Sequence, residues 1–384
     1  MANAVAGALD QPHFISRLRR IDFFLLGCVG LIIAIGMCFI ASAVRGLPEG
    51  AGGTAGFLAR QSIFVAMGLT IFYALQRVSY LTILKHAPLL YLMGLILLCG
   101  VFLTRPINGA RSWYNLYFFK FQPSEVMKPV IILTLAHYLM YRDSYKQLKG
   151  LAIPLILGLV PMVLILKQPD LGTFLAFAPV IFVMLFAAGA RLWHLALMIL
   201  VGGGSMVAMW FTVIHDYQKM RVYAWLNPEE YRLGAAWQLL RSEAAIGSGG
   251  FWGKGWGESS QNGLNLLPEK HTDFIFAVVS EEGGFFLAAL LLLLVFLAAL
   301  SGLGIAARTR EPAGRLIAVG CVTILCSQVI INTGVALGLL PTTGLTFPFV
   351  SYGGSSVICA FICLGLLINI GSQQEVVLAR EDFA

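Results

Sequence analysis

The 384-residue chain is strongly apolar: 58% of its residues are hydrophobic, only 12% are charged, and its formal net charge is +7. A soluble protein carries roughly 25% charged residues, so this composition and a mean hydropathy of +0.82 argue against that class. The seven cysteines all lie within apolar runs and show no CxxC or Cys/His spacing. We therefore expect a multi-pass membrane protein with neither a disulfide framework nor a zinc site.

Ten apolar runs follow one another along the chain, and each is close to the length of a transmembrane helix. They predict an all-α integral membrane protein, a polytopic bundle of about ten transmembrane helices that forms a single membrane domain over residues 1–384. The fourth, eighth and tenth runs also contain polar residues, which leaves their ends least defined. The predicted spans are 22–44, 57–76, 87–104, 124–141, 150–166, 171–190, 192–214, 272–300, 314–338 and 349–371.

The distribution of basic residues predicts the orientation of the bundle. With an even number of spans, both ends and the loops after spans two, four, six and eight share one side. That side holds thirteen basic residues, namely Arg17, Arg19, Arg20, Arg77, Lys85, Arg142, Lys146, Lys149, Arg191, Arg308, Arg310, Arg315 and Arg380. The short loops opposite hold six, namely Arg45, Arg60, Arg105, Arg111, Lys120 and Lys167. The excess predicts that the tails 1–21 and 373–384 are cytoplasmic.

The same topology places two polar segments, 105–123 and the large loop 215–271 between the seventh and eighth spans, outside the cytoplasm. No cleavable signal peptide precedes them, because the first 21 residues lack an apolar core, and the first span would itself target the chain. Cations, amides and aromatic residues occur together in both segments. This mixture suits an amphiphile with a phosphorylated headgroup, since arginine pairs well with phosphate oxygens. A solvated loop that merely packs on the bundle is the alternative.

Ionisable residues inside apolar runs are costly and mark candidate functional positions. Glu125 and Lys128 are three residues apart, so they share a helix face and can pair; an ion pair that locks two helices together is the alternative. Asp170 precedes the sixth span, where it could simply begin the helix and complement its dipole. Asp273 stands where the large loop enters the eighth span. It could be only a dipole partner, but a partly dehydrated aspartate has a raised pKa, as a general base requires.

Other polar residues near the eighth span have simpler roles available. We expect His271 to be a helix-end donor, and Glu281 with Glu282 to form a hydrogen-bonded pair deeper in the bundle. Residues 338–356 contain two prolines and six serines or threonines at membrane depth. Such backbone cannot face lipid and must line a cavity or lie within protein. Broken helices of this kind often build transporter binding sites, which keeps transport open as an alternative.

Six stretches together are similar to the SEDS (shape, elongation, division and sporulation) family of polytopic glycosyltransferases that polymerise lipid II. They occur in the family's order from the third span to the last. Within the family, the run Gly253–Trp256 resembles RodA, the elongation member, whereas Gly344–Thr346 is closer to the division and sporulation members. The six stretches are NGARSW (108–113), FQPSEVMK (121–128), QPDLGT (168–173), AIGSGG (245–250), 267–282 and 340–356.

This resemblance implies a peptidoglycan glycosyltransferase at the outer face of the bacterial cytoplasmic membrane. Asp273 matches the essential aspartate, the expected base toward the 4-hydroxyl of the acceptor sugar. Cations would stabilise the leaving pyrophosphate, and a divalent metal, Mg²⁺ or Mn²⁺, is an open option. The candidate substrate-binding residues are Arg111, Glu125, Lys128, Asp170, Lys270 and Ser351.

The resemblance also implies partners: a class B penicillin-binding protein that supplies transpeptidation, and further elongation-complex membrane proteins. We expect no nucleic acid partner. A lipid II flippase and a membrane scaffold are the competing interpretations. A flippase should need polar residues along the whole depth of the bundle, whereas Glu125, Lys128, Asp170 and Asp273 all lie at predicted outer span ends. A scaffold gives no reason for an embedded Asp273.

Overall fold

The computed structural model describes residues 22–45, 53–105, 111–116, 119–141, 148–212, 214, 216–259 and 269–373. The predicted N-terminal tail, most of the C-terminal tail and parts of both predicted outward segments, including 106–110 and 260–268, lie outside the described residues. Within the described part, the regular structure is helical apart from one small hairpin. Its strands β1 (Tyr114–Leu116) and β2 (Phe119–Phe121) are antiparallel. The predicted all-α class is confirmed.

Each predicted span contains a helix. Seven of these helices are long and apolar enough to cross a membrane: α3 (Phe23–Ala43), α4 (Gly53–Arg77), α9 (Leu171–Ala188), α10 (Leu192–Thr212), α14 (Ile275–Arg308), α15 (Pro312–Ala336) and α16 (Gly354–Ser372). The other three are α6 (Ala87–Gly100), α7 (Pro123–Leu139) and α8 (Ala152–Lys167). Short helices α5 (Tyr80–Lys85), α11 (Asp216–Leu226) and α12 (Trp237–Ser248), with 3₁₀ turns η3 (Val101–Leu103) and η5 (Leu148–Leu151), complete the described elements.

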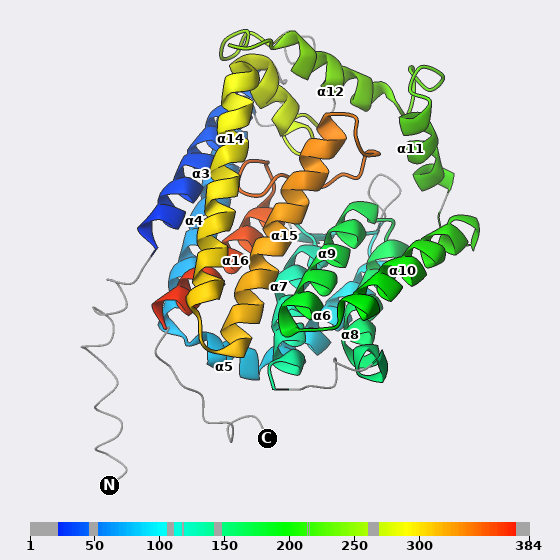
Figure 1. The fold of residues 1–384 in the computed structure, drawn as a ribbon. Helices are drawn as coiled ribbons and strands as arrows, with labels where there is room; N and C mark the ends of the chain where they lie inside the picture. Colours follow the sequence, from blue (N-terminus) through cyan, green and yellow to red (C-terminus); the bar gives the residue numbers. More distant parts are fainter. Residues whose placement is uncertain are drawn as a thin grey trace.

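The helices form a bundle with two distinct ends (Figure 1), in which α3 and α14 run antiparallel and α4 and α16 run parallel. Ser42, at the end of α3, donates to Glu282 of α14 over 2.6 Å, whereas Ser301, nineteen residues further along α14, donates to Asp22 at the start of α3 over 2.7 Å. Ser79 and Gln373 also bond to each other, at 2.8 Å, where α4 and α16 end. Helix α12 lies across one end of the bundle in Figure 1, with α11 beside it, away from the turn that joins α14 to α15.

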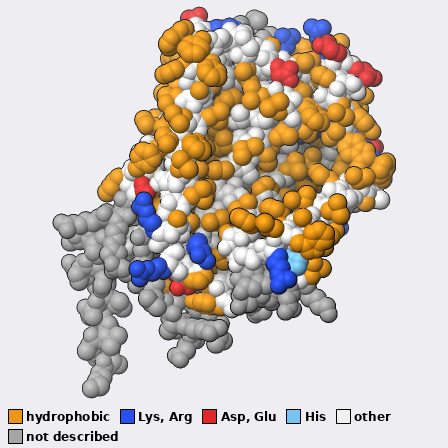
Figure 2. Space-filling model, viewed as in Figure 1, with side chains coloured by type: hydrophobic (Ala, Val, Ile, Leu, Met, Phe, Trp, Pro, Cys, Tyr) orange, Lys and Arg blue, Asp and Glu red, His pale blue; other side chains and the backbone are white. Residues whose placement is uncertain are grey.

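The outer surface matches a membrane environment. Figure 2 shows one face of the molecule, where hydrophobic side chains cover the middle and charged side chains gather toward the two ends. Helices α7, α15 and α16 form the core, because most of their residues are buried. Helix α10 buries only His194 and Leu195 and lies at the edge of the bundle (Figure 1). The chain is therefore a multi-pass membrane protein, as its composition predicts.

The prediction that the eighth span is a single continuous helix over 272–300 is wrong. Helix α14 begins at Ile275, breaks at Gly284 (φ 69°, ψ −171°) and continues to Arg308. Only glycine adopts this φ and ψ readily. The segment before the break, 275–283, is a separate half-helix. Its final carbonyl groups accept from the loop after α12: Lys254 N–H bonds to Glu281 O and Gly255 N–H to Glu282 O, both at 3.0 Å.

The segment 337–353 between α15 and α16 is non-helical and largely buried, so it lies within protein, as its composition requires. Val350 packs against Gly36 in the middle of α3, where a Cβ on Gly36 would lie 2.7 Å from the Val350 Cα. The segment therefore descends well below the end of the bundle that carries α12. It also contacts the turn that precedes α14, where the candidate site lies.

Candidate active site

Asp273 lies in the turn 269–274, before the first residue of α14, and not in the first turn of a helix that begins at 272 as predicted. The backbone N–H groups of Thr272 and Asp273 both bond to the carbonyl of Glu269, at 3.2 and 3.1 Å. These bonds close a turn at which the large loop enters the half-helix. The Asp273 side chain is consequently presented by a loop that other elements must hold in place.

Two side chains from neighbouring elements hold this turn by its backbone. The Ser351 hydroxyl donates to the Thr272 carbonyl over 2.6 Å and accepts from the Phe347 N–H over 2.8 Å. The Asn332 amide donates to the Asp273 carbonyl over 2.7 Å. Ser351 therefore positions the turn in this structure, and its predicted contact with substrate stays a prediction. Asn332, near the C-terminal end of α15, was missed because nothing in its local sequence points to this distant turn.

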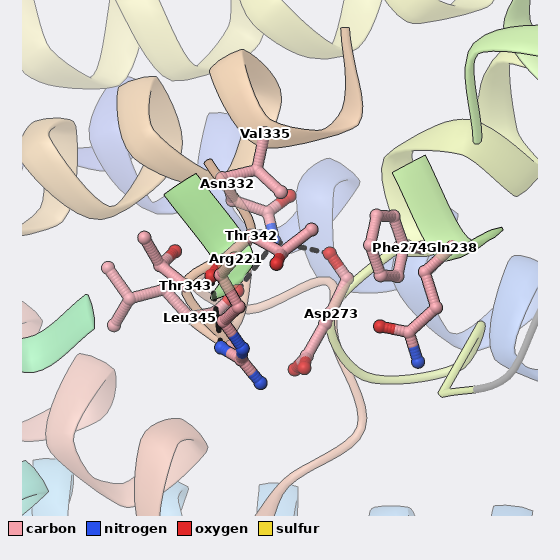
Figure 3. A pocket seen from close by; sticks show the side chains of 10 residues that line it. Arg221, Gln238, Asp273, Phe274, Asn332, Val335, Thr342, Thr343 and Leu345 are labelled. Carbon is pink, nitrogen blue, oxygen red and sulfur yellow. Dashed lines mark hydrogen bonds between the residues drawn. The ribbon is translucent and has the colours of Figure 1, made fainter. Parts of the chain in front are cut away.

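The carboxylate of Asp273 faces a small pocket of about 10 Å³, close to the space that one water molecule needs. Figure 3 shows the guanidinium of Arg221 and the amide of Gln238 on either side of this carboxylate. The pocket also has hydroxyl and amide groups from α15 and the segment after it. Its lining residues are Arg221, Gln238, Asp273, Phe274, Asn332, Val335, Thr342, Thr343, Gly344 and Leu345.

A larger hollow of about 580 Å³ adjoins this pocket and shares Arg221, Gln238 and Thr342 with it. We call it the α11–α12 hollow, because its walls come mainly from those helices and the turn between them. Its lining residues are Tyr217, Arg221, Leu233, Gly234, Ala235, Trp237, Gln238 and Thr342. The volume falls in the range of roughly 300–1,000 Å³ that small-molecule sites occupy. Asp273 therefore lies in a small pocket that adjoins a space of the size of a small-molecule site.

Burial raises the pKa of Asp273 to about 6, and the nearby charges of Glu269 and Asp170 act in the same direction. The positive charge of Arg221 and a hydrogen bond with Thr272 oppose this rise. A carboxylate with a pKa near 6 is mostly ionised at neutral pH and is a stronger base than an exposed aspartate. The prediction of a raised pKa is confirmed, whereas the catalytic role stays a proposal.

Arg221 is another site residue that sequence reasoning did not single out. It is one of six cations in the large loop, and its spacing does not distinguish it from the others. The fold places it beside Asp273 because α11 packs near the segment after α15: the Arg221 Nη1 donates to the Thr342 carbonyl over 2.9 Å. Its guanidinium carbon also lies 4.6 Å from the ring centre of Tyr217.

Glu125 and Lys128 form the ion pair that their spacing predicts. The Lys128 Nζ lies 2.6 Å from Glu125 Oε1, and both side chains are buried on α7. Within the described part of the chain, the second carboxylate oxygen of Glu125 has no hydrogen-bond partner. An ion pair this buried needs further partners to offset its desolvation, so the unpaired oxygen is consistent with a role beyond packing. Neither residue lines the Asp273 pocket.

Asp170 begins α9, as the simpler interpretation expects. Its carboxylate accepts from the Thr173 N–H over 3.0 Å, which caps the helix. The same carboxylate also accepts from Gln122 at 2.8 Å and from Ser124 at 3.2 Å, at the start of α7. The cap therefore joins α9 to α7, and its charge is close enough to raise the pKa of Asp273.

The structure does not bring Arg111 or Lys270 into the Asp273 pocket. Arg111 is exposed, and its Nη1 donates to the Phe102 carbonyl over 3.0 Å; the residues 108–110 of its motif lie outside the described residues. Lys270 is buried, and its burial lowers its pKa to about 8 against the opposing charge of Glu282. Their predicted substrate contacts stay predictions.

Glu281 and Glu282 are buried but do not pair with each other. Glu281 Oε1 lies 2.7 Å from the Lys254 Nζ, whereas Glu282 accepts from Ser42 at 2.6 Å and from the Gly257 N–H at 3.1 Å. Both sit at the upper end of the half-helix, beside the loop after α12, and not deeper in the bundle as expected. These bonds fix the far end of the half-helix whose near end carries Asp273.

Among the described residues, no group of three or more His, Cys, Asp or Glu side chains could hold a metal ion. The described part of the chain thus offers no metal site made of these side chains alone. The open option of a divalent cation would require ligands from elsewhere, such as phosphate oxygens of a substrate.

Comparison with known proteins identifies the family. The family model for cell cycle proteins of the FtsW, RodA and SpoVE type matches residues 22–376. The chain belongs to the SEDS family.

SEDS relatives match over most of their length. The chain is 37% identical over 321 residues to the Escherichia coli K12 peptidoglycan glycosyltransferase MrdB, covering 83% of this chain and 87% of the relative. It is 36% identical over 367 residues to a probable peptidoglycan glycosyltransferase FtsW of Trichlorobacter lovleyi, covering 93% and 94%. Relatives of both the MrdB and the FtsW type are therefore similar to this SEDS chain.

Solved structures of SEDS proteins share the fold. A structure of a peptidoglycan synthase complex that coordinates polymerization and crosslinking matches with a TM-score of 0.79 and 32% identity, covering 93% of this chain and 99% of the other. The crystal structure of the Thermus thermophilus rod shape determining protein RodA matches with a TM-score of 0.69 and 32% identity, covering 93% and 98%. The bundle described above is thus the SEDS fold.

Proposed function

We propose that this chain is a peptidoglycan glycosyltransferase that polymerises lipid II into β-1,4 glycan strands. The observation that carries the proposal is the placement of Asp273: a partly buried carboxylate with a pKa near 6, in a small pocket that adjoins a 580 Å³ hollow. The SEDS relatives named as peptidoglycan glycosyltransferases give this geometry its substrate class.

In the proposed reaction, Asp273 acts as the general base. Its carboxylate takes the proton from the 4-hydroxyl of the acceptor sugar while that oxygen forms a bond to the anomeric carbon of the donor. The bond between this carbon and the donor pyrophosphate breaks, and the electron pair leaves with the pyrophosphate. The configuration inverts from α to β. One positioned base typically contributes about 10²–10⁴-fold, so donor positioning and charge stabilisation must supply the rest.

The cellular setting is also part of the proposal. We place the α11–α12 end at the outer face of the bacterial cytoplasmic membrane, with both termini in the cytoplasm, because the basic residues are concentrated on the opposite side. The run Gly253–Trp256 favours cell elongation over division. A related structure is a complex for polymerization and crosslinking, which supports a class B penicillin-binding protein as partner.

The experiment that tests this function separates polymerisation from transport. The chain is reconstituted with a class B penicillin-binding protein into vesicles that contain labelled lipid II in one leaflet at the start. Polymer is detected as lysozyme-sensitive glycan, and translocation is read from the leaflet distribution of the label. Lysozyme-sensitive polymer from the wild type supports the proposal. Redistribution of lipid II between leaflets without polymer would favour a flippase.

A further inference from the structure

We infer that Arg221 and the α11–α12 hollow bind the phosphorylated headgroup of the substrate directly beside Asp273. This inference rests on the proposed function and names the residue and the space that receive the substrate's charged part. The candidate cations Arg111 and Lys128 do not line this site. The geometry instead points to Arg221, which lies on helix α11 of the large loop.

Arg221 is the only cation among the described residues that line the Asp273 pocket and the α11–α12 hollow. It lines both spaces, so a ligand in the hollow and the carboxylate of Asp273 would share the same guanidinium. A phosphorylated group needs such a charge near the base, because the leaving pyrophosphate develops negative charge as its bond breaks.

Two hydrogen bonds hold the Arg221 side chain but do not occupy all of its N–H groups. One nitrogen donates to the Thr342 carbonyl over 2.9 Å, another donates to the Tyr217 hydroxyl, and the Tyr217 ring lies under the guanidinium carbon at 4.6 Å. A guanidinium has further N–H groups beyond these two bonds. Its planar fork suits two phosphate oxygens at once.

The walls of the hollow suit the rest of a glycolipid headgroup. Trp237 and Gln238 supply an aromatic surface and an amide, the groups that usually stack against and hydrogen-bond sugars. The Arg241 guanidinium lies 4.2 Å from the ring centre of Trp237 and covers one of its faces. A ligand in the hollow would therefore meet an oriented indole, an amide and a charged guanidinium on its way to Asp273.

Binding at Arg221 would also activate the base. The positive charge of Arg221 lowers the pKa of Asp273, whereas the charges of Glu269 and Asp170 raise it. A phosphate anion on Arg221 offsets that positive charge, so the pKa of Asp273 rises when substrate is present. The carboxylate would then be a stronger base in the complex than in the free enzyme.

The test measures binding without turnover. The full-length chain is placed in lipid nanodiscs and titrated with a fluorescent polyprenyl pyrophosphate, with the uncharged polyprenol as the reference probe. The variants are Arg221→Gln, Arg221→Lys and the control Arg232→Gln. Arg232 is an exposed arginine of the same loop that lines neither space. Folding of each variant is checked by its thermal unfolding midpoint.

We expect Arg221→Gln to weaken pyrophosphate binding about tenfold or more, as the loss of charge-assisted bonds implies. Arg221→Lys should lose less, and Arg232→Gln should bind within about twofold of the wild type. Equal binding by Arg221→Gln and wild type, or equal binding of polyprenol and its pyrophosphate by the wild type, would overturn the inference. If the chain makes no glycan but still binds pyrophosphate through Arg221, the proposed function is refuted and the Arg221 binding site is supported.

Discussion

The side-chain amide of Asn332 donates two hydrogen bonds, to the carbonyl of Asp273 at 2.7 Å and to the carbonyl of Leu345 at 2.6 Å. One residue of α15 thus ties the turn that carries the candidate base to the buried segment 337–353. Both acceptors are backbone groups from distant parts of the chain. The position of Asp273 therefore depends on the packing of three separate elements.

Replacing Asn332 should lower activity, although we do not expect the Asn332 side chain to touch the reacting atoms of the substrate. In Asn332→Leu, two buried carbonyl groups lose their donor, which costs about 1–3 kcal/mol for each group left unsatisfied. We expect a lower unfolding midpoint and a glycan polymerisation rate reduced about tenfold or more, because Asp273 loses its anchor. Thr323→Val on the same helix is the control, since the Thr323 hydroxyl donates to the Val319 carbonyl of its own helix. Equal rates in the two variants would contradict the anchoring role.

The pH dependence of the reaction should follow Asp273, whose ionised form is the base. With a pKa near 6, kcat/KM should fall as the pH drops through about 6, because the protonated carboxyl cannot accept a proton. Arg221→Gln removes an opposite charge and should move this acid limb to higher pH. Glu269→Gln removes a like charge, so it should lower the pKa of Asp273 and move the acid limb to lower pH. The other like charge, Asp170, is present in both variants. Shifts of the same sign in both variants would refute the assignment of the limb to Asp273.

The loop after α12 should be sensitive to a single added methyl group. Gly253 has φ 79°, and a Cβ there would lie 2.1 Å from the Glu282 carbonyl oxygen. We expect Gly253→Ala to displace the half-helix and to reduce both the unfolding midpoint and polymerisation. Gly247→Ala, in α12, meets no atom within 4 Å and should be neutral or stabilising by about 0.5–1 kcal/mol. Full activity of the Gly253 variant would show that the loop does not hold the half-helix.

A double-mutant comparison separates the two roles open to the Glu125–Lys128 pair. Lys128→Met alone leaves a buried carboxylate without its partner and should destabilise the fold by about 3–5 kcal/mol. Adding Glu125→Gln removes the stranded charge and should recover most of that stability. If the pair binds substrate, polymerisation stays low in the stable double variant. Recovery of polymerisation together with stability would assign the pair to packing alone.

Sequence reasoning located the spans and Asp273 because apolar length and an embedded carboxylate are local signals. It could not place the break in α14. Residues 275–300 are apolar apart from Ser280–Gly284, and the break at Gly284 depends on loop backbone that arrives from more than twenty residues earlier, as the bond from Lys254 N–H to Glu281 O shows. The predicted pairing of Glu281 with Glu282 failed for the same reason, since their partners are supplied by the loop and by α3.

Arg221 shows the complementary limit within the site. Its residue type suits phosphate, and the loop was recognised as suited to a phosphorylated headgroup, but six cations share that loop. Only the packing of α11 against Thr342 selects one of them. Conversely, Glu125 and Lys128 were paired correctly, because two residues three apart on one helix need no tertiary contact to meet.

The most direct test of the central claim is the rate of lipid II polymerisation by Asp273→Asn and Glu269→Gln, each purified with the same partner and matched for folding. The two carboxylates lie four residues apart in one turn, but only Asp273 lines the pocket. Asp273 as the base predicts that Asp273→Asn makes no detectable glycan, while Glu269→Gln polymerises at a rate close to that of the wild type at neutral pH. Glycan formation by a folded Asp273→Asn variant at the wild-type rate would contradict the account and place the catalytic base elsewhere.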